Sequence, residues 1–65
     1  MNTQPLKDLA DRWKSVAEKS KTQAAEYAAQ GMTKLAHAEH AVSTALTVAS
    51  SQLRDEIEKL EATVQ

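Results

Sequence analysis

The chain lacks cysteine and phenylalanine, and it has one glycine, one proline, one tryptophan and one tyrosine among its 65 residues. Without cysteine it can form neither a disulfide nor a thiolate zinc site, two common reinforcements of chains too short to bury a large core. Self-association is the reinforcement that remains. Because aromatic side chains are so few, alanine supplies much of the 42% hydrophobic content. We therefore expect a homo-oligomer, with a dimer favoured.

Neither sign of charge is in large excess, since eight Lys and Arg residues stand against nine Asp and Glu residues. A net charge of −1 provides no electrostatic footprint for nucleic acid or for an anionic membrane. No apolar run approaches the roughly 18 residues of a membrane span, and residues 1–21 lack the apolar middle of a secretory signal. We interpret residues 1–65 as one small cytoplasmic domain, with neither a membrane nor nucleic acid as its expected partner.

Apolar residues recur with a period close to that of an α-helix, and no alternating strand pattern competes with it. Pro5 suits a first helical turn with Thr3 or Gln4 as the N-cap, so a helix begins near residue 4. Positions eleven apart repeat their apolar character in the series Trp13, Ala24, Leu35, Leu46 and Ile57. Since eleven residues complete three turns, this spacing predicts nearly straight packing rather than the left-handed seam of strict heptads.

Gly31 is the natural place for a turn, because glycine readily takes the left-handed conformation that ends many helices. Met32 and Tyr27 then form the apolar pair of such an ending, and Thr33 caps a second helix from Lys34. The predicted fold is all-α, an antiparallel hairpin of helices at about 4–30 and 34–63 that dimerises into a four-helix bundle. One alternative is a single long helix in a coiled-coil-like oligomer, since the apolar stripe keeps its phase across Gly31. Another is a further break near Ser50 and Ser51.

The charges also favour antiparallel packing. Residues 1–34 contain six basic and four acidic residues, whereas residues 35–65 contain two basic and five acidic residues. An antiparallel hairpin places the acidic end of the chain beside the basic one, which is electrostatically favourable.

The eleven-residue spacing and the Lys-Ala-Glu composition of residues 19–34 resemble those of late-embryogenesis-abundant proteins and exchangeable apolipoproteins. The resemblance is compositional and involves no specific motif. It implies an amphipathic helix that coats a surface. Trp13 and the large apolar residues near the C-terminus fit a packed bundle better, so we assign no family.

Residues 41–53 contain no Lys, Arg, Asp or Glu, although 26% of the chain is charged. Val48 projects to a different side of the helix from Leu46, so one hairpin cannot bury all the apolar residues of this stretch. Small residues allow another helix to approach closely. We expect an oligomer or partner interface here, and the alternative is a water-tolerant Ala, Ser and Thr surface. The predicted interface residues are Trp13, Val42, Ala45, Leu46, Ala49, Leu53, Ile57 and Leu60, and the predicted turn residues are Gly31, Met32 and Thr33.

No group of residues indicates catalysis, a cofactor or a metal. His37 and His40 lie three residues apart and could share a metal with Glu26 or Glu39, but their angles around the helix place both away from the apolar stripe. The hydroxyls of the central stretch have no neighbouring base that would activate them. We therefore expect a protein without enzymatic activity, cofactor or metal.

The function that we predict is a small protein-binding module, such as an adaptor, an inhibitor or a regulatory subunit, that acts through helix–helix contacts as a homo-oligomer. One alternative is an amphipathic helix that coats a lipid or polymer surface. A second is a small dimeric DNA-binding regulator that uses the basic residues of the N-terminal half. Asp8, Asp11 and Glu18 are interspersed among those basic residues, which argues against the DNA alternative.

Overall fold

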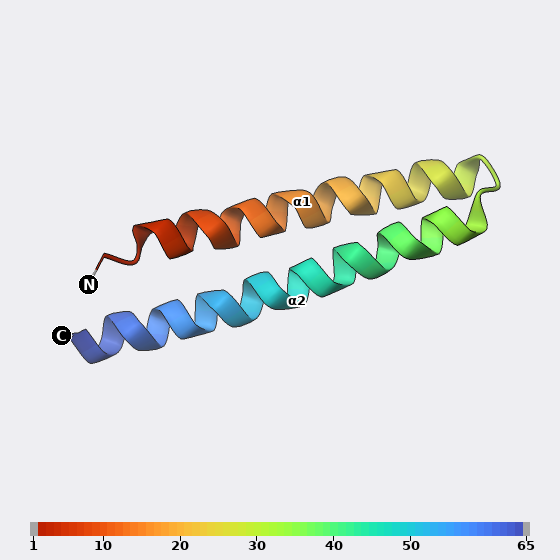
Figure 1. Cartoon of the computed structure of the whole chain (residues 1–65). Helices are drawn as coiled ribbons and strands as arrows, with labels where there is room; N and C mark the ends of the chain where they lie inside the picture. The colour runs from red at the N-terminus through yellow and green to blue at the C-terminus, as the bar shows by residue number, and fades with distance from the viewer. Residues whose placement is uncertain (1, 65) are drawn as a thin grey trace.

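The computed structural model describes residues 2–64, so Met1 and Gln65 lie outside the described residues. Two helices, α1 (Gln4–Ala29) and α2 (Thr33–Val64), run antiparallel and pack along their length (Figure 1). The Cα trace measures 52 Å along its long axis and 14 and 10 Å across it. The predicted hairpin is confirmed. The alternatives of one continuous helix and of a break near Ser50 and Ser51 are wrong, because the chain reverses at Gly31 and α2 continues past both serines.

Gly31 makes the reversal possible. Its φ of 77° lies in the left-handed region, where only glycine pays no steric penalty. The Met32 amide donates to the Tyr27 carbonyl at 2.9 Å, and the Gly31 amide donates to the Ala28 carbonyl at 3.1 Å. These are the two hydrogen bonds of a Schellman ending. Thr33 was expected to cap the second helix from outside, but α2 already begins at Thr33.

The start of α1 differs from expectation in how it is capped. Thr3 occupies the N-cap position before Pro5, but its hydroxyl makes no capping hydrogen bond. That hydroxyl donates instead to Glu61 of α2, at 2.8 Å. Asn2 accepts from the Gln4 amide at 3.0 Å and so satisfies one of the amides at the helix start. The N-terminus of α1 is therefore held against the last turns of α2.

The buried and half-buried residues between the helices follow a strict heptad spacing, with alternating steps of three and four residues. Here the sequence-based expectation of an eleven-residue stripe is wrong, because its member Leu35 is exposed. The heptad series of α1, which includes Trp13, Ser20 and Tyr27, does not continue into α2. The seam positions of α2 are shifted by two residues from those that the α1 series would give. We call these positions the seam: Thr3, Leu6, Ala10, Trp13, Ala17, Ser20, Ala24 and Tyr27, and Ala36, Glu39, Ser43, Leu46, Ser50, Leu53, Ile57 and Leu60.

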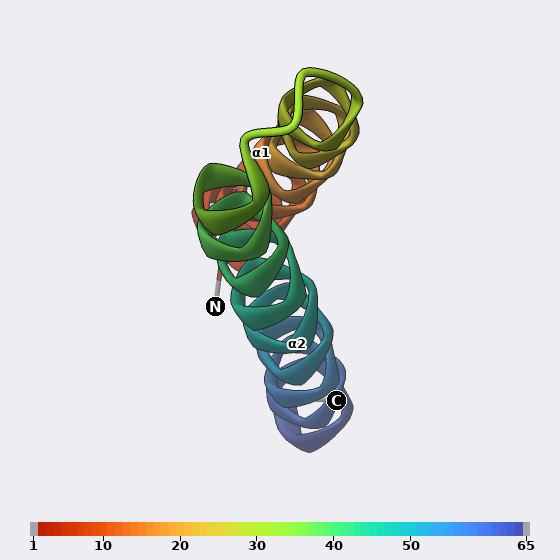
Figure 2. The same cartoon turned by 90° about the vertical axis from the view of Figure 1, so that its right-hand side faces the viewer.

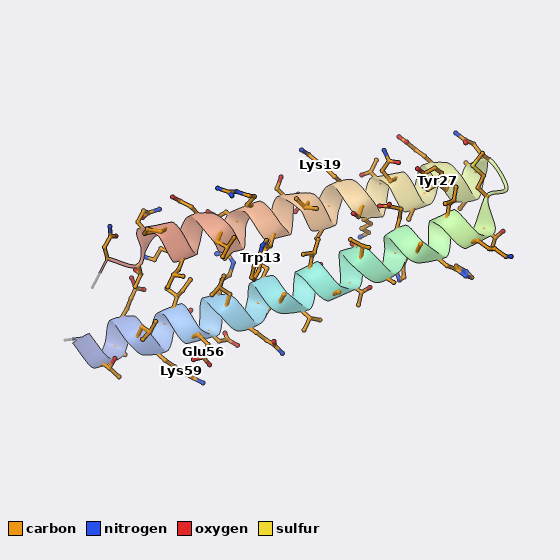
Figure 3. The ribbon with its side chains drawn as sticks, viewed as in Figure 1. Trp13, Lys19, Tyr27, Glu56 and Lys59 are labelled. Carbon is orange, nitrogen blue, oxygen red and sulfur yellow. The ribbon has the colours of Figure 1, made fainter. Side chains whose placement is uncertain are left out.

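Heptad packing requires the helix axes to be slightly inclined, since the apolar row drifts around a straight helix. Figure 2, which looks from the turn end, shows that inclination between α1 and α2. Trp13 lies on the side of α1 that faces α2 (Figure 3). The hairpin is therefore a two-stranded antiparallel coiled coil rather than a pair of straight helices.

Small residues that recur along the seam bring the two backbones close together. Ala10 is 0% exposed and Ala17 is 2% exposed. The Ser50 hydroxyl, 3% exposed as a residue, donates to the Ala10 carbonyl at 2.9 Å. A helical carbonyl points toward the helix C-terminus, so Ser50 lies near the levels of Ala10 and Trp13, and the alternation of seam positions places it in one layer with Trp13. A side-chain hydroxyl that reaches the backbone of the facing helix shows how little separates them.

The same register pairs large residues with small ones along the seam. Leu53 is level with Ala10, and Leu46 is level with Ala17. Among the described residues no large side chain falls below 2% exposure, so this interlocking seam holds the helices together without a deep core. No helix in residues 2–64 has the length and apolar character needed to cross a bilayer.

Replacing Gly31 with Val should destabilise the hairpin by about 1–2 kcal/mol or more, because a β-branched residue is strained at positive φ. An added Cβ meets nothing within 4 Å, so backbone strain and not a clash is the cause. Gly31→Asn is the control, since Asn tolerates this conformation better and should lose less. Urea denaturation monitored by circular dichroism measures both, and a more stable Val variant would contradict the role of Gly31.

Replacing Ala10 with Leu should destabilise the chain by about 1–3 kcal/mol, because the added atoms force apart two helices that touch at this position. Ala25→Leu is the matched control. Ala25 is exposed on the same helix, so the same change should alter the stability little. Equal denaturation midpoints for the two variants would show that the helices are not in close contact at Ala10.

Candidate interaction surface

The seam divides the rest of the hairpin surface into two long sides. In a heptad, the positions beside the seam lie alternately to its left and right, and antiparallel pairing brings like positions of the two helices to the same side. One side carries Lys7, Lys14 and Lys21 of α1 with Thr47, Arg54 and Glu61 of α2, and we call it the charged side. The opposite side, which we call the open face, carries Leu9 and Val16 of α1 with Leu35, Ala38, Val42, Ala45 and Ala49 of α2.

Ion pairs cross the charged side near the open end of the hairpin. Lys7 Nζ lies 2.8 Å from Glu61 Oε2, and Arg54 pairs with Asp11. The Thr3 hydroxyl donates to the same Glu61 oxygen at 2.8 Å. The four charged side chains are 41–67% exposed, so each ion pair contributes little by itself. Together they tie the end of α2 to the start of α1.

Glu61 is the acidic group whose ionisation these contacts alter. The pKa of Glu61 is lowered, chiefly by the hydrogen bond from Lys7 and next by the hydrogen bond from Thr3. Desolvation opposes the shift, but it is the smaller effect. The carboxylate form of Glu61 is therefore favoured in the folded chain.

The open face has an apolar character that the charged side lacks. Val16 is 41% exposed, Val42 is 44% exposed and Leu35 is 49% exposed. Their heptad positions place all three on the same long side, beside the exposed small residues Ala38 and Ala45. Exposed large apolar residues that are grouped, rather than scattered singly, mark surfaces that contact other molecules.

On α2 the open face is also free of charge. Between Lys34 and Arg54 the only Lys, Arg, Asp or Glu is Glu39, which is half-buried at the seam. Val48, 49% exposed, widens the apolar surface toward the outside of α2. Charged side chains resume beyond the stretch, and Figure 3 shows Glu56 and Lys59 on the side of α2 away from α1. The uncharged part of the surface thus has defined ends.

The structure places the eight predicted interface residues in two groups. Ile57 is buried at the seam, and Trp13, Leu46, Leu53 and Leu60 are half-buried there, so these five hold the hairpin together. The other three belong to the open face: Val42 and Ala45 are exposed, and Ala49 is half-buried. Gly31, Met32 and Thr33 lie at the turn and the start of α2.

Val16 and Leu35 belong to the open face, but they are not among the predicted interface residues. The signal that could have placed them is the heptad spacing of each helix taken separately. Both residues immediately precede a seam residue, Ala17 and Ala36 respectively. A single apolar stripe drawn through Gly31 does not show this relation, because the heptad positions shift at the turn.

The histidines lie apart from the open face. His37 and His40 are exposed on α2, at positions toward the charged side. Within residues 2–64, no group of three or more His, Cys, Asp and Glu side chains could hold a metal ion together. The arrangement that stands out on this surface is therefore the apolar one.

No protein-family model, curated protein or solved structure matched the chain when it was compared with them.

Replacing Glu61 with Gln should lower the stability at neutral pH, because the charged partner of Lys7 is lost. Since the folded-state pKa of Glu61 is depressed, its contribution is present above the unfolded-state pKa and is lost as the pH falls through the folded-state pKa. The melting temperatures of the two proteins should therefore converge in acid. Glu58→Gln, which removes the same charge from an exposed neighbour, is the control. Equal melting temperatures at neutral pH would show that the contacts of Glu61 do not stabilise the hairpin.

Proposed function

We propose that this chain is a small protein-binding module that acts through helix–helix contacts as a homo-oligomer, in the manner of an adaptor, an inhibitor or a regulatory subunit. The observation that carries the proposal is the open face, where Val16, Leu35 and Val42 stand 41–49% exposed along one side of the hairpin. A helix packed on that side would cover all three at once. The proposed activity is binding, without catalysis.

The weakness of the hairpin core supports this proposal. Its most buried residues are small, and the large apolar residues at the seam are only half-covered, apart from Ile57. Burying one large apolar side chain fully contributes roughly 1.5–3 kcal/mol, so covering the open face would add substantially to a marginal fold. Folding and binding of this chain are then linked.

The basic side chains of α1 do not favour the DNA-binding alternative. Lys14 and Lys21 lie on the charged side, whereas Arg12 and Lys19 flank the open face. Lys7 is already paired with Glu61. A surface that binds the phosphate backbone needs these charges on one face.

Replacing Ala45 with Glu should dissociate the oligomer, because the change puts a charge in the middle of the open face. Ala45 is exposed in the hairpin, so the helices should still form. Thr44→Glu is the matched control, since it adds the same charge to an exposed neighbour that points toward the charged side. Light scattering should give a dimer for the wild type and the Thr44 variant and a 7.1 kDa monomer for the Ala45 variant.

The melting temperature should also rise with protein concentration in the wild type and not in the Ala45 variant. An unchanged mass for the Ala45 variant would show that the open face is not the contact. The lipid-coating alternative makes the opposite forecast, namely a chain that is mostly unfolded in water and gains helix on phosphatidylcholine and phosphatidylglycerol vesicles.

A further inference from the structure

We infer that the open face is occupied by a second copy of this chain, with α2 packed antiparallel on α2 of that copy about a two-fold axis that passes between Val42 and Ala45. This inference rests on the proposed function and names its partner and geometry. It rests on four observations: the absence of charge on the open face of α2, the order of large and small residues along it, the charges at its two ends, and its extent.

The absence of charge on the open face of α2 favours contact with α2 of the second copy over contact with its α1. If α2 packed on α1 of the second copy instead, the same alternation of positions would bring Val42 against Lys19 and Leu35 against Glu26. Burying those charges without partners would be costly. Contact of α2 with α2 joins two uncharged surfaces and leaves the charged positions at the rim.

The order of residues along the open face suits an antiparallel pair. In antiparallel coiled coils, residues of the two seam positions alternate across each layer. With the axis between Val42 and Ala45, each Val42 is level with Ala45 of the second copy, and each Ala38 is level with Ala49 of the second copy. A large residue then faces a small one at the centre, as it does in the seam of the hairpin itself. Parallel pairing would place Val42 against Val42, where the side chains would be crowded, and Ala45 against Ala45, where they would leave a gap.

Charges at the two ends of the stretch favour the same orientation. Lys34 and Asp55 are both exposed, and they occupy the same heptad position on the outer edge of the open face. Antiparallel pairing brings Lys34 within one helical turn of Asp55 of the second copy, at both ends of the interface. Parallel pairing would put like charges together instead. Oppositely charged rims fix the orientation of an interface more than its affinity.

The α1 helices of the two copies meet on the other half of the interface. There the attractive charge pairs outnumber the repulsive ones. The same axis brings Arg12 within one residue of the level of Glu26 of the second copy, twice per dimer. Lys19 comes near Lys19 of the second copy, once per dimer, close to the axis. Two attractive pairs therefore oppose one repulsive pair, and Val16 adds apolar area beside them.

The extent of the surface is sufficient for a stable dimer. The uncharged part of the open face on α2, from Leu35 to Gln52, spans about 27 Å at the rise of an α-helix. A standard interface removes about 800 Å² from each partner, about a sixth of the 4852 Å² that one chain exposes. One long side of a two-helix rod can supply that area. The product is a four-helix bundle in which all neighbouring helices are antiparallel.

Cysteine crosslinking tests the orientation, and the absence of native cysteine makes each variant a single-thiol protein. Ala38→Cys and Ala49→Cys are prepared separately, and each is oxidised alone and in an equimolar mixture that was unfolded and refolded together. The inference predicts a disulfide-linked dimer in the mixture and little in either variant alone, because residue 38 of one copy meets residue 49 of the other. His37→Cys mixed with Ala49→Cys is the control and should not crosslink.

The mass of each sample, measured by light scattering before oxidation, separates the possible failures. A dimer that crosslinks Ala38→Cys with itself would overturn the antiparallel inference and leave the proposed function intact. A dimer that crosslinks in no combination would place the contact elsewhere and would also overturn the inference. A monomer at all concentrations would overturn the inference together with the homo-oligomeric function.

A charge exchange gives an independent test of the same register. Lys34→Glu or Asp55→Lys alone should raise the dimer dissociation constant about 2–10-fold, because each makes two like-charged pairs, and the double variant should restore it. Lys34→Glu places its new charge favourably for the dipole of α2, since residue 34 lies in the first turn. Asp55 is exposed and lies more than two turns before the end of α2, so neither change should weaken the hairpin itself. Single variants that dimerise as well as the wild type, or a double variant weaker than both, would contradict the inferred contact.

Discussion

The close approach of two helix backbones at Ala10, Ala17 and Ser50 is the constraint on which the rest of this molecule depends. A helix pair separated by large residues on both sides would fill its own seam and need nothing else. Here small residues recur along the seam, and at Ala10 and Ala17 the small residue faces a leucine of α2. Ser50 joins the two backbones through its hydroxyl where a larger residue could not fit. The hairpin gains a well-defined register from this arrangement, but it gains little buried apolar volume.

That thin seam explains why the large apolar residues divide into two sets. Leu46, Leu53 and Ile57 contact the facing helix, whereas Leu35 and Val42 lie one heptad position to the side and remain exposed. A pair of helices has only one seam, and it cannot bury apolar residues on two faces of α2 at once. This fold therefore leaves Leu35 and Val42 exposed, on the side opposite the ion pairs of Lys7 with Glu61 and of Arg54 with Asp11.

The positions of the ion pairs give the hairpin its asymmetry. Lys7 with Glu61 and Asp11 with Arg54 cross the charged side, where exposed polar groups would meet water in any assembly. These pairs orient the ends of the helices and contribute little buried surface. The open face has no such pairs over Leu35–Ala49, so only apolar contact is available there. One side thus carries the charged pairs and the other carries the exposed apolar residues.

Much of the fold could be predicted from the sequence, because the signals for it are local. Gly31 marks the turn through its own conformational freedom, and Pro5 marks the first helical turn through its ring. The division of the apolar residues was not predictable from the eleven-residue spacing. That spacing joins Trp13, Ala24, Leu46 and Ile57 of the seam to Leu35 of the open face, since eleven residues match one heptad plus one step of four. The heptad spacing of each helix taken separately, which changes phase at the turn, tells the two sets apart.

The capping of α1 shows how tertiary contacts redirect a local preference. Thr3 has the residue type and position of an N-cap, and an isolated helix would use its hydroxyl that way. In the hairpin the hydroxyl reaches Glu61 instead, and Asn2 accepts from the Gln4 amide. The exchange keeps the helix start satisfied while it adds a link between residues 58 positions apart. The same carboxylate also pairs with Lys7, so the start of α1 and the end of α2 are held together on one side, away from the exposed apolar residues of the open face.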